Sequence, residues 1–393
     1  MGVMDKRRVV VTGIGAVAAP GTGTDDLWKG LQRVPDGPGP HVVKDWDPEP
    51  WIPMREHRRL DRFTQFALMS TYEAFEQSGP LAVEPNRVTV SVATGIGGLE
   101  SLETLVHNSD KDEPRISPFL IPMMMANAAA AAISIKYGFG GQVTTPAVAC
   151  AAGAQSILDG LRQIQWGYAD AAVVGGTEAA ARPSAEAGFK AARALSPTGI
   201  ARPFDVDRDG FVMGEGGAIL VLEAKEVAAA RGATILAEIL GGASTGDAYH
   251  ITAPHPDGRG AERAMRLALE DSGLVPADVT YINAHGTGTD LNDRTEGMVI
   301  ERIFGDRQPA VSSIKGTTGH GLGASGSIEA VAVVEAIRRG ELPPNIGLTN
   351  QDPEIPLTDI VREPREWVPG AVLSNSFGFG GHNTVLAFGP DSN

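Results

Sequence analysis

Residues 143–167, VTTPAVACAAGAQSILDGLRQIQWG, contain the only cysteine of the 393-residue chain, Cys150. A β-branched run leads into it and a stretch with helical apolar spacing follows it, so the sequence predicts a strand-to-helix junction at the thiol. A helix that begins there places its unpaired N–H groups and positive dipole end at the sulfur, which lowers the thiol pKa and can stabilise an oxyanion. The alternative is an inert cysteine that packs as a small hydrophobe.

The composition is that of an ordinary globular protein, with 42% hydrophobic and 21% charged residues. A single cysteine excludes an internal disulfide and a cysteine-rich metal site, and it favours a reducing compartment. The net charge of −15 argues against nucleic acid as a partner. The apolar residues 123–135 are too few to span a bilayer. We therefore expect a cytoplasmic protein without a membrane segment.

Short β-branched runs alternate with helix-length amphipathic stretches along the whole chain, which predicts an α/β fold. Helices are expected at residues 64–79, 154–167 and 260–273, each ending at a glycine. The strands between them are almost continuously apolar, which favours parallel sheets covered on both faces. The clearest strands are expected at RRVVVTG, RVTVSVATG, QVTTPAVA, DAAVVGG, GGAILVLE, ATILAEILGG, VTYINAHG, PAVSSIK and NTVLAFG.

The order of these elements indicates an internal duplication. A strand that ends in a glycine turn opens the chain at VVVTGIGAV (9–17) and occurs again at LAEILGGAS (236–244). No Pro-rich or Ser-rich linker separates the two parts, so we expect them to pack as one unit. We predict two similar halves, residues 1–233 with Cys150 and residues 234–393 with two candidate histidines.

Both histidines follow predicted strands and precede glycine-rich loops. His285 lies in YINAHGTGTDLNDRTE (281–296), and His320 lies in VSSIKGTTGHGLGASGSIEA (311–330). The carboxyl ends of strands are where open α/β sheets bind ligands, although a histidine satisfied within a turn is the alternative. Thr287 and Thr289 can bind amide or phosphate groups of a long substrate. The Gly-Lys-Ser/Thr order of a phosphate loop is missing, and so are the spacings of a metal site.

A further glycine-rich stretch, SNSFGFGGHN (374–383), carries two phenylalanines between glycines. Such a density of glycine indicates close backbone approach or unusual dihedral angles. The glycines can act as a hinge on which Phe379 moves. The alternative interpretation is a simple glycine-rich hairpin.

Together these segments resemble the β-ketoacyl-(acyl carrier protein) synthases, the decarboxylating condensing enzymes of the thiolase fold. The resemblance rests on ACAAG around Cys150, NAHGTGT around His285, SSIKGTTGH from Lys315 to His320, NSFGFGG, RPFDVDRDGFVMGEG (202–216) and GDAYHITAP (246–254). It implies two similar halves in an α-β-α-β-α layering and favours a reactive Cys150. It also implies decarboxylative condensation of an acyl group, held on cysteine, with a malonyl thioester, without a metal or bound cofactor.

The resemblance also implies a role for particular residues. Cys150 would be the nucleophile, with the backbone N–H groups of Cys150 and Phe379 as the oxyanion hole. His285 and His320 would polarise the malonyl thioester, with Lys315, paired with Glu296, orienting their loop. Further residues would bind substrate: Thr287 and Thr289 the phosphopantetheine arm of the carrier protein, Phe379 as a gate, and Phe189, Leu102, Met124 and Met125 the acyl chain.

An acyl carrier protein is acidic, so a basic docking surface is expected, and the candidates are Arg55, Arg58, Arg59, Arg62 and Arg193. The resemblance further implies a homodimer, or a heterodimer with a chain-length-factor-like subunit, and it leans towards type II polyketide ketosynthases. The chain departs from many relatives in Ala151-Ala152 after the cysteine and in His382, which could place a third histidine near the site. A thiolase would need a second cysteine. A non-catalytic chain-length-factor-type subunit, which would normally lack the cysteine, is the alternative function.

Overall fold

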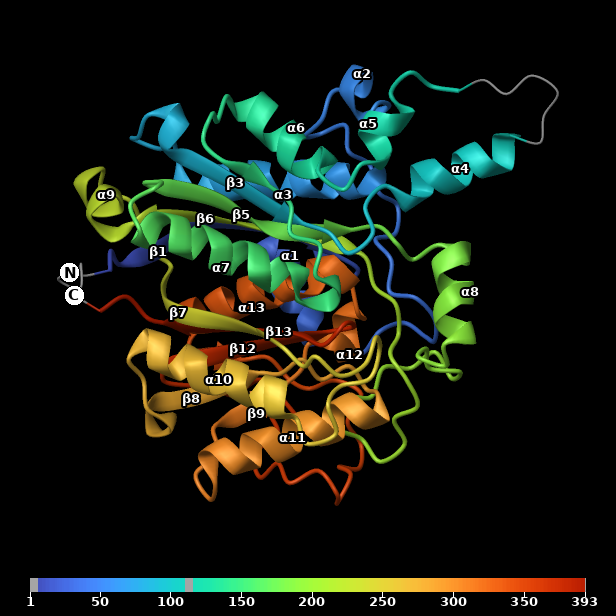
Figure 1. Cartoon of the computed structure of the whole chain (residues 1–393), viewed down its shortest axis with the longest axis vertical. Helices are drawn as coiled ribbons and strands as arrows, with labels where there is room; N and C mark the ends of the chain where they lie inside the picture. The colour runs from blue at the N-terminus through green and yellow to red at the C-terminus, as the bar shows by residue number, and fades with distance from the viewer. Residues whose placement is uncertain (1–5, 110–115, 393) are drawn as a thin grey trace.

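The protein has an α-β-α-β-α arrangement in a computed structural model that describes residues 6–109 and 116–392 (Figure 1). The main helices are α1 (Thr24–Leu31), α2 (Met54–His57), α3 (Arg62–Ser78), α4 (Leu99–Ser109), α5 (Leu120–Met124), α6 (Ala128–Tyr137), α7 (Ala152–Gln165), α8 (Pro183–Ala191), α9 (Lys225–Ala230), α10 (Arg259–Ser272), α11 (Asp290–Phe304), α12 (Lys315–Thr318) and α13 (Ser325–Arg339). The strands are β1 (Val9–Ala18), β2 (Gly21–Thr22), β3 (Val88–Ala93), β4 (Val143–Thr144), β5 (Ala171–Glu178), β6 (Gly216–Ala224), β7 (Ala237–Gly246), β8 (Val279–Asn283), β9 (Ala310–Ser312), β10 (Glu341–Leu342), β11 (Arg365–Glu366), β12 (Ala371–Gly378) and β13 (His382–Gly389).

The main sheet repeats one topology. Its strands follow the order β4-β3-β5-β6-β1 and then β7-β13-β12-β8-β9, with β1 paired to β7 at the centre. From the edge of the sheet to its centre, each half has two parallel pairings followed by two antiparallel pairings. The two halves therefore match strand by strand: β1 with β7, β3 with β8, β4 with β9, β5 with β12, and β6 with β13. The proposed division at residue 233 lies between α9 and β7.

The expectation of parallel sheets is confirmed for only part of the main sheet. β3 pairs in parallel with β4 and β5, and β8 with β9 and β12. In contrast, β1 and β6 pair antiparallel, and so do β7 and β13. Every residue of β1 and of β6 is nevertheless buried, because helices cover both faces of the sheet. A continuously apolar strand sequence therefore indicates that both faces of the sheet are buried, but it does not indicate whether the strand pairs parallel or antiparallel.

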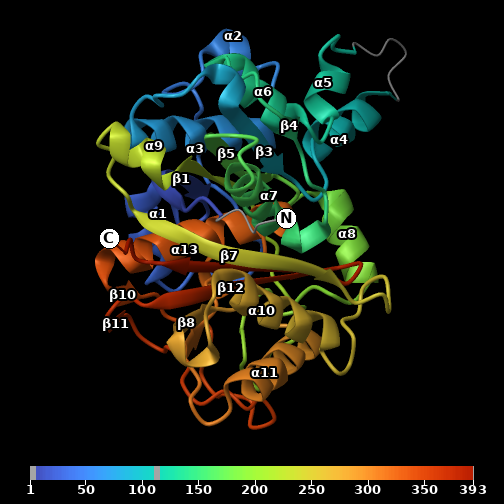
Figure 2. The same cartoon turned by 60° about the vertical axis from the view of Figure 1, so that its left-hand side comes forward.

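Two helices form the central layer and contact strands of both halves, α7 from the first half and α13 from the second (Figures 1 and 2). α3 and α6 cover the outer face of the first half, and α10 covers that of the second. The central helices approach closely at Gly153, where an added Cβ would lie 2.8 Å from the backbone nitrogen of Ser327 and 2.9 Å from the Gly323 oxygen. A larger residue at Gly153 would push the two halves apart.

The three predicted helices appear as α3, α7 and α10, whereas the strand expected at QVTTPAVA is only β4, Val143–Thr144. The chain then runs without regular structure to Cys150. SNSFGFGGHN spans the end of β12, the turn and the start of β13, with Gly380 and Gly381 of the turn at positive φ. None of the helices in the described ranges is both long and apolar enough to cross a membrane.

Candidate active site

Cys150 lies at the start of the central helix α7. A 3-10 turn, Ala149–Ala151, precedes the helix, and Ala149 adopts a left-handed φ of 49°. A non-glycine residue in this region costs of order 1–3 kcal/mol, so the surrounding packing must hold the backbone there. The backbone N–H groups of Phe379 and of Cys150 itself favour the thiolate and so act to lower the thiol pKa. Ala151 and Ala152 are fully buried beneath the cysteine.

The expected decrease in the thiol pKa is not found. Burial raises the pKa of Cys150 to about 11, although the Phe379 N–H and the Lys315 charge act in the opposite direction. Cys150 is 8% exposed, so loss of water around the thiolate outweighs the effect of the helix N-terminus on the pKa.

His285 and His320 meet at the same cavity as Cys150. Their ring centroids are 5.4 Å apart at an interplanar angle of 84°, and both residues are 3% exposed. Burial, followed by the charge of Lys315, holds the pKa of both imidazoles well below the ordinary value. Both rings are therefore neutral at physiological pH, and each carries one proton on one nitrogen.

Lys315 pairs with Glu329 of α13, not with Glu296 as expected. Its ammonium also donates to the His285 carbonyl oxygen at 2.5 Å and lies 3.4 Å from Nδ1 of His285. The pair is buried, and burial raises the pKa of Glu329 to about 7. Sequence reasoning missed Glu329 because Glu296 and Glu329 lie at similar separations from Lys315 along the sequence. Only the fold determines which of the two carboxylates contacts the lysine.

Glu296 supports the His285 loop in another way. Its carboxylate accepts hydrogen bonds from the backbone N–H groups of His285 and Gly286 at 2.9 and 2.8 Å, and from the Asn375 side chain at 3.0 Å. Three donors fix the backbone that carries the imidazole, so Glu296 orients His285 from behind.

The cavity around Cys150 has a volume of about 460 Å³. Thr287, Thr289, Phe189 and Phe379 line it, as the sequence predicts, and Arg193 lies at its edge. The two threonine hydroxyls are 2.9 Å apart. Phe189 and Phe379 have ring centroids 6.4 Å apart. The lining is mainly apolar and includes hydroxyl groups, so the cavity can hold an apolar chain joined to a polar group.

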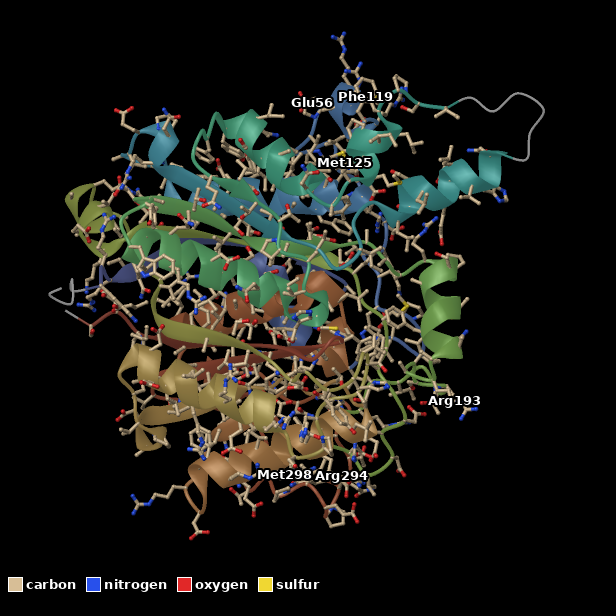
Figure 3. The ribbon with its side chains drawn as sticks, in the orientation of Figure 1. Glu56, Phe119, Met125, Arg193, Arg294 and Met298 are labelled. Atoms are coloured by element: carbon tan, nitrogen blue, oxygen red, sulfur yellow. The ribbon has the colours of Figure 1, made fainter. Side chains whose placement is uncertain are left out.

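Several predicted residues lie elsewhere. Leu102 is 39% exposed on α4 and does not line the cavity, and neither do Met124, Met125 and His382. Met125 lies near Phe119 on the surface formed by α5 (Figure 3). The expectation that these residues contact the acyl chain, or that His382 joins the catalytic histidines, has no support in this chain's own cavity.

The predicted arginine surface is not one patch. Arg62 turns inward and pairs with Glu215 at 2.7 Å, and Arg59 stacks over the Phe119 ring at 4.6 Å. Arg55 and Arg58 are exposed around α2, whereas Arg193 lies at the end of α8, well separated from α2 (Figure 3). Of the five arginines, only Arg193 adjoins the cavity.

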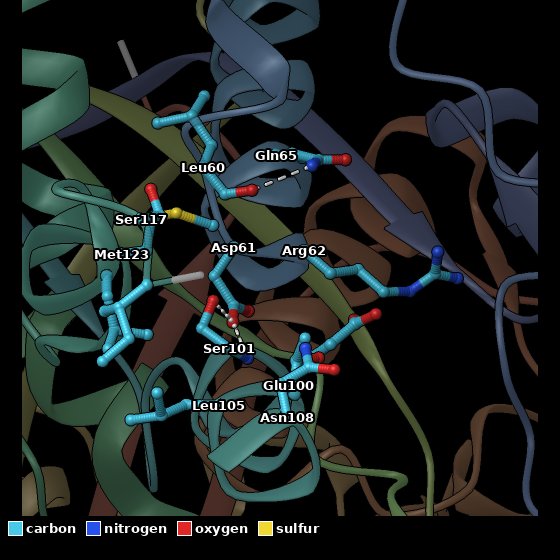
Figure 4. Close-up of a pocket in the computed structure, with 13 residues that line it drawn as sticks. Leu60, Asp61, Arg62, Gln65, Glu100, Ser101, Leu105, Asn108, Ser117 and Met123 are labelled. Carbon is cyan, nitrogen blue, oxygen red and sulfur yellow. Dashed lines mark hydrogen bonds between the residues drawn. The ribbon is translucent and has the colours of Figure 1, made fainter. Parts of the chain in front are cut away.

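A second cavity, of about 340 Å³, lies beneath α4 and α5 (Figure 4). Asp61 at its floor accepts hydrogen bonds from the backbone and hydroxyl of Ser101 at 2.9 and 2.7 Å. None of the candidate catalytic residues lines this cavity, so it is separate from the chemistry at Cys150.

Glu178 is a buried carboxylate that the sequence analysis did not single out. It accepts hydrogen bonds from the Thr94 hydroxyl and the Ile96 N–H on one oxygen, and from the N–H groups of Gly95 and Gly323 on the other, at 2.6–3.3 Å. Glu178 thus ties a loop of the first half to the turn after His320. Its signal in the sequence is an acidic residue at the end of an apolar strand.

Glu178 gives an expected pH dependence of stability. Burial raises its pKa from 4.5 to about 7, so the folded state binds more protons than the unfolded state between these values. The free energy of unfolding of the wild type should therefore fall, relative to that of Glu178→Gln, as pH rises from about 4.5 to about 7. Urea unfolding of both proteins at pH 5 and 7.5 measures this difference.

The exposed carboxyl of Glu56 on α2 provides the control variant, Glu56→Gln, which removes a carboxyl group and leaves Glu178 in place. A wild-type protein that gains stability relative to Glu178→Gln over this range would contradict the assignment.

Within residues 6–109 and 116–392, no group of three or more His, Cys, Asp and Glu side chains is arranged to hold a metal ion. Cys150, His285, His320 and Lys315 supply a thiol, two neutral imidazoles and a buried ammonium, together with backbone N–H groups. A thiol with oxyanion donors suits acyl transfer, and two imidazoles suit stabilisation of a developing enolate.

Comparisons with known proteins agree with this chemistry. Residues 43–228 match the family model of the beta-ketoacyl synthase N-terminal domain, and residues 236–349 match that of the C-terminal domain. The chain is 48% identical to the 3-oxoacyl-(acyl-carrier-protein) synthase 2 of a Synechocystis strain, with 99% of each chain covered.

Solved structures are similarly close. The ishigamide ketosynthase/chain length factor superimposes with a TM-score of 0.91 at 34% identity, covering 98% of this chain and 100% of that chain. A type II PKS acyl-carrier protein in complex with its ketosynthase bound to the hexaketide gives a TM-score of 0.89 at 29% identity, with the same coverage.

Proposed function

The chain belongs to the beta-ketoacyl synthase family, and on this premise we propose that Cys150, His285 and His320 carry the two steps of its reaction. The protein is a β-ketoacyl-(acyl carrier protein) synthase, an acyltransferase that elongates an acyl chain by decarboxylative condensation. The observation that supports the residue roles is the convergence of one thiol and two neutral imidazoles on one cavity.

In the first step the sulfur of Cys150 attacks the thioester carbonyl of an acyl group delivered on the phosphopantetheine arm. The carbonyl oxygen becomes an oxyanion, which the backbone N–H groups of Cys150 and Phe379 stabilise. The carbon–sulfur bond to the arm then breaks, and the thiol proton of Cys150 ends on the departing pantetheine thiol. The product is an acyl-cysteine.

In the second step a malonyl thioester occupies the cavity, with its carbonyl oxygen at His285 and His320. The bond to the carboxylate breaks, CO₂ leaves, and the electron pair forms an enolate that the two imidazoles stabilise. The enolate carbon attacks the acyl-cysteine carbonyl, and collapse of the tetrahedral intermediate expels the Cys150 thiolate. Thr287 and Thr289 hold the arm, Phe379 acts as a gate, and Phe189 contacts the acyl chain.

A product assay tests this function directly. Purified protein is incubated with acyl-carrier-protein thioesters and malonyl-carrier protein, and mass spectrometry follows release of CO₂ and appearance of a 3-ketoacyl product two carbons longer. Absence of the product with every acyl donor would contradict an autonomous enzyme. If a partner subunit that supplies its own nucleophile then restores activity, the chain is a chain-length-factor-type subunit.

The preferred acyl donor also decides the pathway. We propose elongation of a polyketide or a fatty acyl chain. Reaction of β-keto donors would assign the protein to polyketide elongation. Saturated acyl donors as the preferred substrates, with no reaction of β-keto donors, would assign it to fatty acyl elongation. A cytoplasmic location fits a chain with one thiol and no disulfide partner.

Arg193 is proposed to contact the acidic carrier protein, because it is exposed at the cavity edge. Arg193→Glu should raise KM for a carrier-linked substrate about tenfold, equivalent to about 1.4 kcal/mol of binding, with little change in kcat. Steady-state kinetics at low and high salt measure this effect, which salt should reduce.

The control is the same variant with acyl-pantetheine, a substrate that lacks the carrier protein, for which KM should not change. An equal increase in KM for both substrates would assign Arg193 to the cavity instead of the carrier-protein contact.

A homodimer is proposed through the edge of the sheet at β4. Val143 on this edge strand is 40% exposed, and Ile135 of the neighbouring α6 is 81% exposed (Figure 2). An open strand edge beside apolar side chains is typical of an interface. Light scattering should give twice the 41.0 kDa chain mass, and Ile135→Glu should shift the protein to monomers at micromolar concentration.

Val368→Glu provides the matched control, since Val368 is 87% exposed in the segment before β12 and away from β4. A wild-type monomer that becomes a heterodimer with a second subunit would support the chain-length-factor pairing instead.

A further inference from the structure

Ser325 is the first residue of α13, and its side chain contacts the imidazole of His320. Its hydroxyl oxygen lies 2.9 Å from Nδ1 of His320, and the two residues are 4% and 3% exposed. On another side the ring of Phe211 meets the imidazole edge-on, with centroids 5.2 Å apart at 81°. The imidazole is therefore held in one orientation, with Nδ1 towards Ser325.

The direction of this hydrogen bond follows from which of the two groups has another acceptor for its proton. A serine hydroxyl has one proton to donate, and in the described part of the chain Nδ1 of His320 is its sole hydrogen-bond partner. If His320 donated from Nδ1, the buried serine proton would have no acceptor, which costs about 1–3 kcal/mol. Donation by the serine satisfies both groups.

We propose that Ser325 is a positioning residue that donates its hydroxyl proton to Nδ1 of His320 and thereby keeps the imidazole proton on Nε2. This inference rests on the proposed function, in which His320 faces the malonyl thioester. Nε2 is the nitrogen left for the cavity, which His320 lines beside Cys150. His320 then presents an N–H donor to the thioester oxygen.

His285 is placed in the same way by a different group. The ammonium of Lys315 lies 3.4 Å from Nδ1 of His285, and an ammonium can only donate. Nδ1 of His285 is therefore an acceptor as well, and its proton is on Nε2. The two imidazoles become a pair of N–H donors directed at one oxygen, which is the arrangement that stabilises an enolate.

The tautomer can be measured without any substrate. In protein labelled with ¹⁵N-histidine, the nitrogen shifts and ring couplings of His320, assigned by their loss in His320→Gln, should show a protonated Nε2 and an unprotonated Nδ1. A protonated Nδ1 in the wild type would overturn the proposal. This result is independent of whether the protein condenses acyl chains.

Substitution of Ser325 tests the consequence for the reaction. Ser325→Ala should slow malonyl decarboxylation about fivefold, because the loss of one hydrogen bond costs about 1 kcal/mol. The rate of Cys150 acylation should stay within about twofold of the wild-type rate. Ser325→Thr keeps the hydroxyl and should restore decarboxylation. Equal losses in both partial reactions, or no rescue by threonine, would overturn the positioning role.

Ser327→Ala is the matched control, because Ser327 is an equally buried serine of α13 whose hydroxyl bonds backbone oxygens of Gly176 and Ala324. It should leave the ratio of the two partial reactions unchanged. A wild type that neither acylates nor decarboxylates would contradict the proposed function, while the nitrogen shifts would still decide the tautomer.

Discussion

Cys150→Ala should lose condensation by at least about 10³-fold, because removal of the nucleophile leaves only binding and the oxyanion donors. Intact-mass measurement after incubation with acyl-carrier-protein should show one acyl adduct on the wild type and none on the variant. The substitution removes one sulfur at a buried position between alanines, so the fold should be retained. A persistent adduct on Cys150→Ala would place the acyl group elsewhere.

His320→Ala separates the two steps and is the control for this result. It retains Cys150 and the backbone N–H groups of Cys150 and Phe379, so the acyl adduct should still form. Decarboxylation of the malonyl thioester should fall about 10²–10⁴-fold, as expected when an acid–base or donor group is removed from a transition state. If His320→Ala fails to acylate while remaining folded, the division of roles between Cys150 and the histidines is wrong.

Lys315→Met should lower the free energy of unfolding by about 3–5 kcal/mol, because it leaves the carboxylate of Glu329 buried without its partner. The side chains of both residues are no more than 2% exposed. The variant also loses the donor to the His285 carbonyl. Urea unfolding monitored by circular dichroism, with the slope m compared between variants, gives the difference.

Replacement of both partners should recover much of this loss. In Lys315→Met/Glu329→Leu no unpaired charge remains, and an apolar pair of similar volume is often close to neutral in a protein interior. Lys190→Met removes an exposed ion pair with Glu186 and should cost no more than about 1 kcal/mol. A Lys315→Met variant as stable as Lys190→Met would contradict a buried ion pair.

Local patterns predicted the α/β class, since apolar spacing and glycine stops act within one element. The layered thiolase-like fold was implied by the resemblance to the condensing enzymes, and both expectations are confirmed. The predicted strand direction was wrong for part of the sheet because burial on both faces makes antiparallel β1 and β6 as apolar as parallel strands.

Candidate site residues were predicted best where a motif is contiguous. Cys150, His285 and His320 each stand in a short glycine-containing segment, and the fold brings all three to one cavity. Leu102 and Met125 do not line this cavity, and their contact with an acyl chain stays a prediction, because hydrophobicity alone does not say which side of α4 or α5 faces the substrate.

By itself, the sequence determined that a thiol at the start of a helix belongs with two histidines on glycine-rich loops. Only the tertiary structure decided the electrostatics: burial raises the pKa of Cys150, α13 brings Glu329 to Lys315, and the same helix places Ser325 at His320. The physical reason is that element type depends on neighbours in the chain. The charge state and hydrogen-bond partner of a buried group depend instead on which distant residues exclude water from it.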